Sequence, residues 1–212
     1  MRLYQAVAWT LLLTCPALAA TPFMLTLRDG AGNPVPDAVV YLQGATVVAA
    51  PSAPPVVIDQ RDKVFVPLVT VIRTGTEVSF PNSDSVSHHV YSFARPNTFE
   101  LPLYKGTRSP TVHFDHAGVV TLGCNIHDSM VGWIVVVDTP YFAKTDARGV
   151  AAINAVAAGG YDVFAWSPRL DPARPLSAGS VTLDETLRPQ AVAVSRKLRA
   201  AAPAGALADG DY

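Results

Sequence analysis

Charged side chains are scarce in this chain, and long helical patterns with caps are absent. Of its 212 residues, 16 are Lys or Arg and 17 are Asp or Glu, so the formal net charge is only −1. This balance argues against nucleic-acid binding, which calls for a basic patch. The sequence also lacks a Gly-x-Ser-x-Gly elbow and a His-Glu-x-x-His helix, two signatures of hydrolytic enzymes. We therefore expect a protein that is not an enzyme by itself.

Cysteine is almost absent as well. One of the two cysteines, Cys15, lies in a targeting segment, so the mature chain keeps only Cys124. In an oxidising compartment a single cysteine cannot be half of an internal disulfide. Metal ligation explains such a residue best, and the alternative is a buried, chemically inert thiol.

The first twenty residues have the features of a signal peptide. Arg2 supplies a positive charge, a short apolar stretch follows, and Ala-Leu-Ala at 17–19 fits a cleavage site. The apolar stretch is too short to span a bilayer comfortably. We expect residues 1–20 to be removed near Ala19 or Ala20, a periplasmic location, and no membrane span.

The rest of the chain is rich in strand and turn residues. Its 18 Pro and 14 Gly, with many Val and Thr, predict an all-β protein. An Ala/Pro-rich linker and Pro140 separate a central domain at 56–139 from flanks at 21–50 and 140–199. The Ala/Gly-rich end at 200–212 is expected to be a disordered tail. The expected strands are 23–28, 37–43, 56–60, 68–73, 77–80, 88–94, 111–114, 119–124, 131–138, 142–145, 150–153, 161–166, 180–184 and 191–197.

The most informative feature is the run from Cys124 to Met130. It places a thiolate, an imidazole and a thioether within seven residues, and a second His-bearing segment lies upstream at 80–93. One Cys, two His and one Met are the ligands of a blue-copper electron-transfer site, in which Met is a weak axial ligand. A tight loop between strands can turn Cys, His and Met onto one point, and the second His must come from a separate strand.

Two motifs carry a family resemblance. Phe80-Pro-Asn-Ser-Asp-Ser-Val-Ser-His88 together with Cys124-x-x-His127-x-x-Met130 resembles the cupredoxins, and within them the plastocyanin and amicyanin group. The whole chain is also similar to periplasmic proteins labelled methylamine-utilisation-like. The resemblance to the cupredoxins covers residues 56–138 and implies a Greek-key β-sandwich that binds one copper ion, as Cu(I) or Cu(II). It also implies electron transport between redox partner proteins, such as a periplasmic dehydrogenase or a cytochrome.

The same resemblance implies roles for individual residues. Cys124 would be the thiolate ligand, His88 and His127 the imidazole ligands, and Met130 the weak axial ligand. The residues expected around these ligands are Asn82, His89 and Asn125.

The pair His88-His89 poses a choice, because adjacent residues on a strand point to opposite faces. In the resembling families the ligand follows six residues after the Asn matched by Asn82, which selects His88. His89 stands where those families usually have Asn. It either adds a new side chain beside the ligands or lies on the opposite face of the strand.

Other residues in these segments have more ordinary expectations. Asn82 and Asp84 are expected to organise the turn before His88. His113 and His116 are expected to be surface or packing residues. The residues expected to be aromatic core are Tyr91, Phe93, Trp133 and Trp166.

The two flanks resemble parts of one module. Residues 25–42 resemble the opening hairpin of carboxypeptidase-regulatory-like domains, which are small transthyretin-like β-sandwiches, and residues 145–163 resemble later strands of that module. The two strands before Gln43 cannot cover a hydrophobic face alone. We hypothesise that both flanks form one sandwich, into which the central domain is inserted. The alternative is that the N-terminal strands extend the central domain.

A copper chaperone or storage protein without electron transfer is the alternative function. Soft ligands also suit Cu(I) trafficking, but that class favours Met- or His-rich tracts, and this chain has three Met. A structural zinc site is conceivable too, although Met is a poor zinc ligand.

Overall fold

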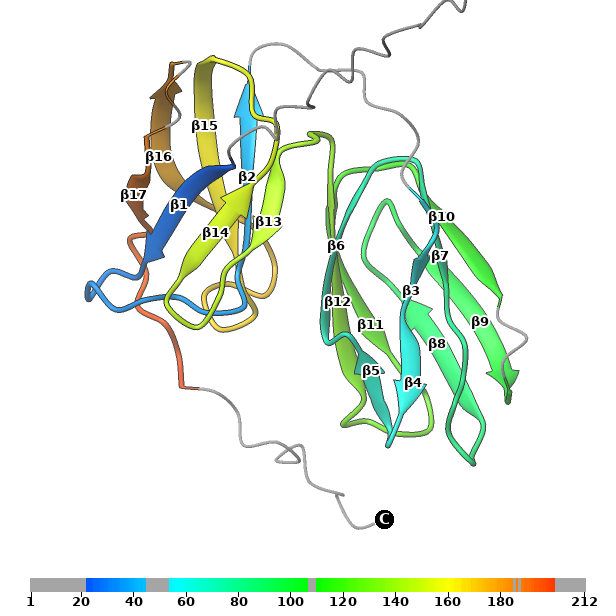
Figure 1. Cartoon of the computed structure of the whole chain (residues 1–212). Helices are drawn as coiled ribbons and strands as arrows, with labels where there is room; N and C mark the ends of the chain where they lie inside the picture. Colours follow the sequence, from blue (N-terminus) through cyan, green and yellow to red (C-terminus); the bar gives the residue numbers. More distant parts are fainter. Residues whose placement is uncertain (1–21, 45–53, 107–109, 185, 187, 201–212) are drawn as a thin grey trace, which may run out of the picture.

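Figure 1 shows a computed structural model of the chain, which describes residues 22–44, 54–106, 110–184, 186 and 188–200. The predicted signal peptide and all but the first residue of the predicted tail lie outside these residues. Within them every regular element is a β-strand, which confirms the all-β fold class. In the described part of the chain, no helix has the length and apolar character needed to cross a membrane.

The central domain is built from ten strands around one apolar core. They are β3 (Val56–Val57), β4 (Asp59–Arg61), β5 (Val64–Val66), β6 (Val69–Arg73), β7 (Thr76–Ser79), β8 (His88–Ser92), β9 (Phe99–Tyr104), β10 (Thr111–Phe114), β11 (Gly118–Gly123) and β12 (Val131–Val137). One sheet has the order β6-β12-β11-β8-β9, and facing it are the sheet β10-β7-β3 and the hairpin β4-β5. Side chains of both layers, including Phe80, Phe114 and Ile134, share one buried cluster. The domain is therefore a β-sandwich.

The flanks form a second sandwich, which we call the flanking sandwich. Its strands are β1 (Phe23–Arg28), β2 (Val39–Gly44), β13 (Phe142–Lys144), β14 (Val150–Ile153), β15 (Gly159–Trp166), β16 (Leu176–Leu183) and β17 (Gln190–Ala193). They pair in the orders β14-β1-β17 and β13-β2-β15-β16. Both N-terminal strands thus pair with strands that follow Pro140, as the hypothesis of a split sandwich requires. The transthyretin-like character of this unit stays a prediction.

Thr145 ties the two halves of the flanking sandwich together. Its buried hydroxyl accepts a hydrogen bond from the backbone N–H of Ala38 (2.9 Å) and donates one to the C=O of Val35 (2.7 Å). Its own N–H donates to the C=O of Ala38 (2.9 Å). One side chain therefore satisfies backbone groups that lie more than a hundred residues away in the sequence.

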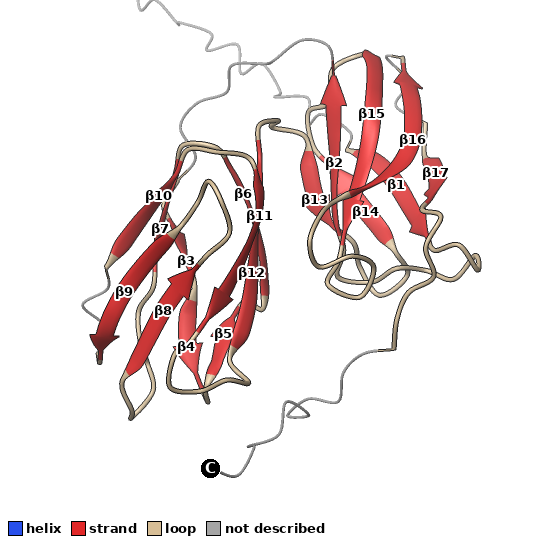
Figure 2. Cartoon of the chain, turned by 180° about the vertical axis from the view of Figure 1, so that it is seen from behind, coloured by secondary structure: helices blue, strands red, loops and turns tan. Residues whose placement is uncertain are grey.

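An apolar contact joins the two sandwiches. Trp166 and Val39 of the flanking sandwich are buried together with Val69 and Val135 of the central domain. The rings of Trp133 and Trp166 lie 6.2 Å apart across this contact. Trp166 is fully buried, as predicted for a core aromatic, and Trp133 is partly buried against it. Figure 2 shows the sandwiches side by side, and the flanking sandwich covers the outer face of the central domain at β6 and β12.

Two strands were not expected from the sequence. β9 contains Pro102, which demotes a strand pattern, and it lies at the edge of its sheet, where Pro is tolerated. β5 has only three residues and pairs with β4 across Asp62 and Lys63, both of which have positive φ. Its central Phe65 is buried against Gly132, where a Cβ would lie 2.9 Å from the side chain. The hairpin belongs to the core because Phe65 packs there. A segment of three strand residues is too short for its sequence pattern to predict this.

Replacing Thr145 by Val should lower the free energy of unfolding of the flanking sandwich by about 1–3 kcal/mol, because it leaves buried backbone groups unpaired. Urea unfolding followed by tryptophan fluorescence measures the change. Thr182→Val, on the exposed side of β16, is the matched control and should shift stability by less than about 0.5 kcal/mol. Equal effects of the two substitutions would contradict the role given to Thr145.

Candidate metal centre

A tight loop between β11 and β12 carries three of the four predicted ligands. Cys124 follows directly after β11 and is 2% exposed, while Met130 comes just before β12 and is fully buried. The N–H of Met130 donates to the C=O of His127 (2.9 Å), and that of Val131 donates to the C=O of Ser129 (3.1 Å). These turns bring the loop back to the core between the two buried ends.

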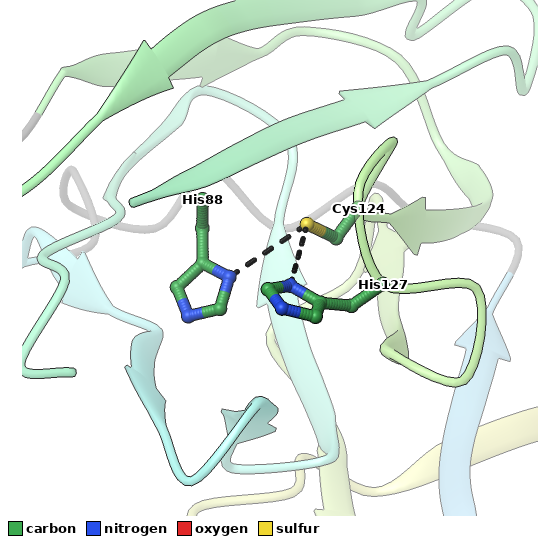
Figure 3. Close-up of side chains that lie close together, drawn as sticks. All are labelled: His88, Cys124 and His127. Atoms are coloured by element: carbon green, nitrogen blue, oxygen red, sulfur yellow. Dashed lines mark hydrogen bonds between the residues drawn. The ribbon is translucent and has the colours of Figure 1, made fainter. Parts of the chain in front are cut away.

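The structure brings His88, Cys124 and His127 together (Figure 3). The Sγ atom of Cys124 lies 3.7 Å from Nδ1 of His88 and 3.7 Å from Nδ1 of His127. The possible ligand atoms of the three residues all lie within 4.8 Å of one another. His88 comes from β8 and the other two from the loop, as the motif spacing requires.

These distances suit one metal ion. Sulfur and nitrogen atoms bound about 2.3 and 2.0 Å from a first-row metal lie about 3.7 Å apart when the angle at the metal is near 120°. Both Sγ–Nδ1 distances have this value. A thiolate with two imidazoles in a trigonal arrangement fits copper. The three side chains could therefore hold a copper ion through Sγ and two Nδ1 atoms.

Exposure differs among the three residues. His88 and Cys124 are buried, whereas His127 is partly exposed and follows Ile126, which is 50% exposed. His127 is thus the member of the cluster nearest to solvent.

Met130 shares the buried apolar cluster of the central domain with Cys124. Its place at the end of the loop puts its side chain in the same core as that of Cys124. Its role as axial ligand stays a prediction.

Asp84 holds His88 in place. Its Oδ2 lies 2.7 Å from Nε2 of His88, and the same carboxylate accepts the backbone N–H groups of Asp62 (2.6 Å) and Lys63 (3.0 Å). Burial raises the pKa of Asp84, but the hydrogen bonds from Lys63, His88 and Asp62 outweigh it, so the pKa lies below its ordinary value. The carboxylate favours the tautomer in which Nε2 of His88 carries the hydrogen, and Nδ1 is then free to bind a metal.

Asn82 fixes the turn that carries Asp84. Its buried side chain donates to the C=O groups of Val86 (2.9 Å) and Tyr104 (3.0 Å), and its Oδ1 accepts the N–H of Asp84 (3.0 Å). The prediction that Asn82 and Asp84 organise the turn before His88 is confirmed. Sequence reasoning missed the contact of Asp84 with the ligand, for which the spacing of four residues was the only signal.

His89 lies on the opposite face of β8, which was one of the two alternatives. Its Nε2 is 2.9 Å from Oε1 of Glu100, and its ring is 5.7 Å from that of Tyr91. The expectation that the His89 side chain lies beside the ligands is therefore wrong, because successive residues of a strand point to opposite faces. Asn125 is exposed and lines a small hollow with His89 on this same outer face.

Phe93 corrects another expectation. We predicted it to be core, but it is 79% exposed. Tyr91, also predicted to be core, is only partly buried and lies on the outer face of the sheet. The alternation that carries His88 inward carries both rings outward.

Comparisons with known proteins found several similar solved structures. A copper-containing nitrite reductase from Thermus scotoductus SA-01 is 26% identical over 43% of this chain, with a TM-score of 0.38. A purple cupredoxin from Nitrosopumilus maritimus is 25% identical over 39% of this chain and 97% of its own, with a TM-score of 0.34. These neighbours are cupredoxins.

A reduced amicyanin mutant is similar as well, with 23% identity over 45% of this chain and 90% of its own and a TM-score of 0.36. The chain spans only 25% of the length of the nitrite reductase. No protein-family model matches this chain, and no curated protein matches it. All three likenesses extend over less than half of the chain.

Replacing Asp84 by Ala should lower copper affinity about 10- to 100-fold, the usual cost of losing a partner that orients a ligand histidine. Competition with a chelator of known affinity measures the change. Asp128→Ala is the matched control, because it removes the same charge from an exposed position in the ligand loop. Unchanged affinity in Asp84→Ala, or an equal loss in both variants, would show that Asp84 does not position His88.

Proposed function

We propose that the protein is a periplasmic type 1 (blue) copper protein that binds one copper ion and carries single electrons between redox partners. The observation that carries the proposal is the donor set of one thiol and two Nδ1 atoms, with 3.7 Å between Sγ and each nitrogen. Met130 completes the set as a weak axial ligand. Bound copper would supply a one-electron couple, and no substrate bond changes.

The protein's own contribution is to hold the ligands in one geometry for both oxidation states. His88 is held by Asp84, which is itself held by Asn82 and by the tip of the β4-β5 hairpin. Cys124 is buried at the end of a strand. Because these contacts form within the protein, little rearrangement accompanies a change in copper charge.

His127 offers the first exit for electrons. It is the partly exposed ligand, and the residues just before the two imidazole ligands include Ile126 and Val86, which are 50% and 40% exposed. Redox partners, such as a periplasmic dehydrogenase or a cytochrome, would bind there weakly through a small apolar contact.

Copper storage or delivery is the second candidate. Soft ligands favour it, but a protein that hands over copper needs ligands that a partner can reach. Here Cys124 and His88 are buried, and only His127 is partly exposed. Burial of two of the three ligand residues favours a resident ion over a transferred one.

Copper-loaded protein should show an intense thiolate-to-copper absorption band and a narrow copper hyperfine splitting. Cys124→Ala should lose both, because the band requires the thiolate. His113→Ala, at an exposed position on β10, should keep both. A colourless protein that binds only Cu(I), or one that prefers zinc, would contradict the electron-carrier proposal and favour trafficking or a structural metal.

Met130→Leu should keep the copper and its colour but raise the reduction potential, because the axial ligand tunes that potential and its loss removes electron density from Cu(II). Cyclic voltammetry measures the change. Met24→Leu, in β1 of the flanking sandwich, is the control and should leave the potential unaltered. An unshifted potential in Met130→Leu would remove Met130 from the ligand set.

A further inference from the structure

Six cationic side chains gather at one end of the flanking sandwich, and we call them the basic patch. They come from the end of β1, from the loop between β15 and β16, and from the segment that follows β17. The members of the patch are Arg28, Arg169, Arg174, Arg196, Lys197 and Arg199. The same three segments carry two carboxylates, Asp29 and Asp171. The patch therefore has a surplus of four positive charges, although the formal net charge of the chain is −1.

Backbone hydrogen bonds hold the three segments together. The N–H of Gly30, next to the end of β1, donates to the C=O of Arg196 (2.9 Å). Arg169 and Arg199 are joined twice. The N–H of Arg199 donates to the C=O of Arg169 (2.9 Å), and Nε of Arg169 donates to the C=O of Arg199 (2.8 Å). The fold thus keeps like charges close to one another, against their mutual repulsion.

The two carboxylates of the patch are buried, whereas most of its cations face solvent. Asp29 accepts three backbone N–H groups, one of them from Leu198 (3.0 Å). Asp171 lies 3.0 Å from the guanidinium of Arg196. Five of the six cationic residues are exposed, and Arg169 is partly exposed. The surface of the patch is therefore positive.

The basic patch and the candidate metal centre lie at the same end of the molecule. The loop that carries Arg169 begins directly after Trp166, whose ring lies 6.2 Å from that of Trp133. Trp133 belongs to β12, which begins directly after Met130. Figures 1 and 2 both show the ends of β1 and β17 at the same end of the two sandwiches as the β4-β5 hairpin. A protein that docks at His127 therefore approaches the end of the molecule that carries the patch.

We propose that the basic patch binds an acidic surface of the redox partner and so brings that partner to His127. The proposal rests on the proposed function and adds the charge of the partner. Complementary charges raise the rate at which two proteins meet, by about 10- to 1,000-fold at low salt. The exposed apolar residues near His127, Ile126 and Val86, cannot supply this attraction, because apolar surfaces attract each other only where water is expelled between them.

An anionic membrane is the other surface that a cluster of Arg and Lys attracts. Proteins that bind a membrane surface commonly add apolar side chains that enter the lipid. Among the described residues, every large hydrophobic side chain that is exposed belongs to the central domain, and none to the flanking sandwich. The patch thus offers charge without an apolar anchor, which favours a protein partner.

Two forms of one redox protein test the charge of the partner. Cytochrome c is basic, and succinylation of its lysines gives an acidic derivative with the same haem. Electron exchange of each form with the copper-loaded full chain is timed by stopped flow from the haem absorbance, at increasing ionic strength. The rate with the succinylated form should fall as salt is added, because salt screens the attraction. The rate with the native form should rise or stay constant.

Reversal of two charges locates the surface. Lys197→Glu combined with Arg199→Glu cancels the surplus of four charges, so exchange with the succinylated form should slow about 10-fold or more at low salt. The control is Arg95→Glu combined with Arg188→Glu. It alters the net charge equally, at exposed positions after the end of β8 and before the start of β17, and should change the rate less than about twofold, because the patch is intact.

The outcomes separate this proposal from the proposed function. If the copper-loaded chain has no thiolate-to-copper band, or exchanges electrons with neither form, the proposed function fails and this proposal falls with it. If band and exchange are present but both double variants slow the rate equally, or neither does, the basic patch alone is wrong. Unchanged exchange in Lys197→Glu/Arg199→Glu, with lost binding to vesicles of phosphatidylglycerol and phosphatidylcholine, would assign the patch to a membrane and overturn the proposal.

Discussion

The hydrogen bond between Asp84 and His88 is the contact on which the candidate metal centre depends. It commits Nε2 of a fully buried imidazole to a carboxylate and leaves Nδ1 facing the thiol of Cys124. The carboxylate is fixed in turn by backbone N–H groups of the β4-β5 hairpin and by Asn82. A hairpin of six strand residues, which adds little to the sheets, therefore determines how a ligand is oriented.

The sequence motifs predicted the residues of this candidate site, but they did not predict the hydrogen bonds that hold His88 in place. Cys124, His127 and Met130 follow from one short loop, and strand alternation separates His88 from His89. Asp84 could be assigned only to a turn, because its contact with His88 depends on how that turn folds against the β4-β5 hairpin. The exposure of Phe93 was missed for a related reason. A strand pattern says which residues share a face, but the extent to which another layer covers that face is a property of the whole fold.

The fold class and most strands were also predictable, since Pro, Gly and turn motifs bound them. The pairing of β1 and β2 with strands beyond Pro140 was expected from motif resemblance and from the inability of two strands to form a core. The contact of Trp133 with Trp166 was not expected. Apolar residues on the outer face of a sheet do not indicate which surface they will pack against. That contact gives the central sheet a covered half and an open half.

The insertion of one sandwich within another has a consequence for how the chain is made. Residues 56–137 contain all the strands of the central domain, so this domain can fold as soon as they are available. β1 and β2 must wait for β13 to β17, which are synthesised after the central domain. Contacts so distant in sequence form slowly, and unpaired apolar strands are prone to aggregate in the meantime. The domain that carries the candidate metal centre is therefore complete while the strands that precede it are still without partners.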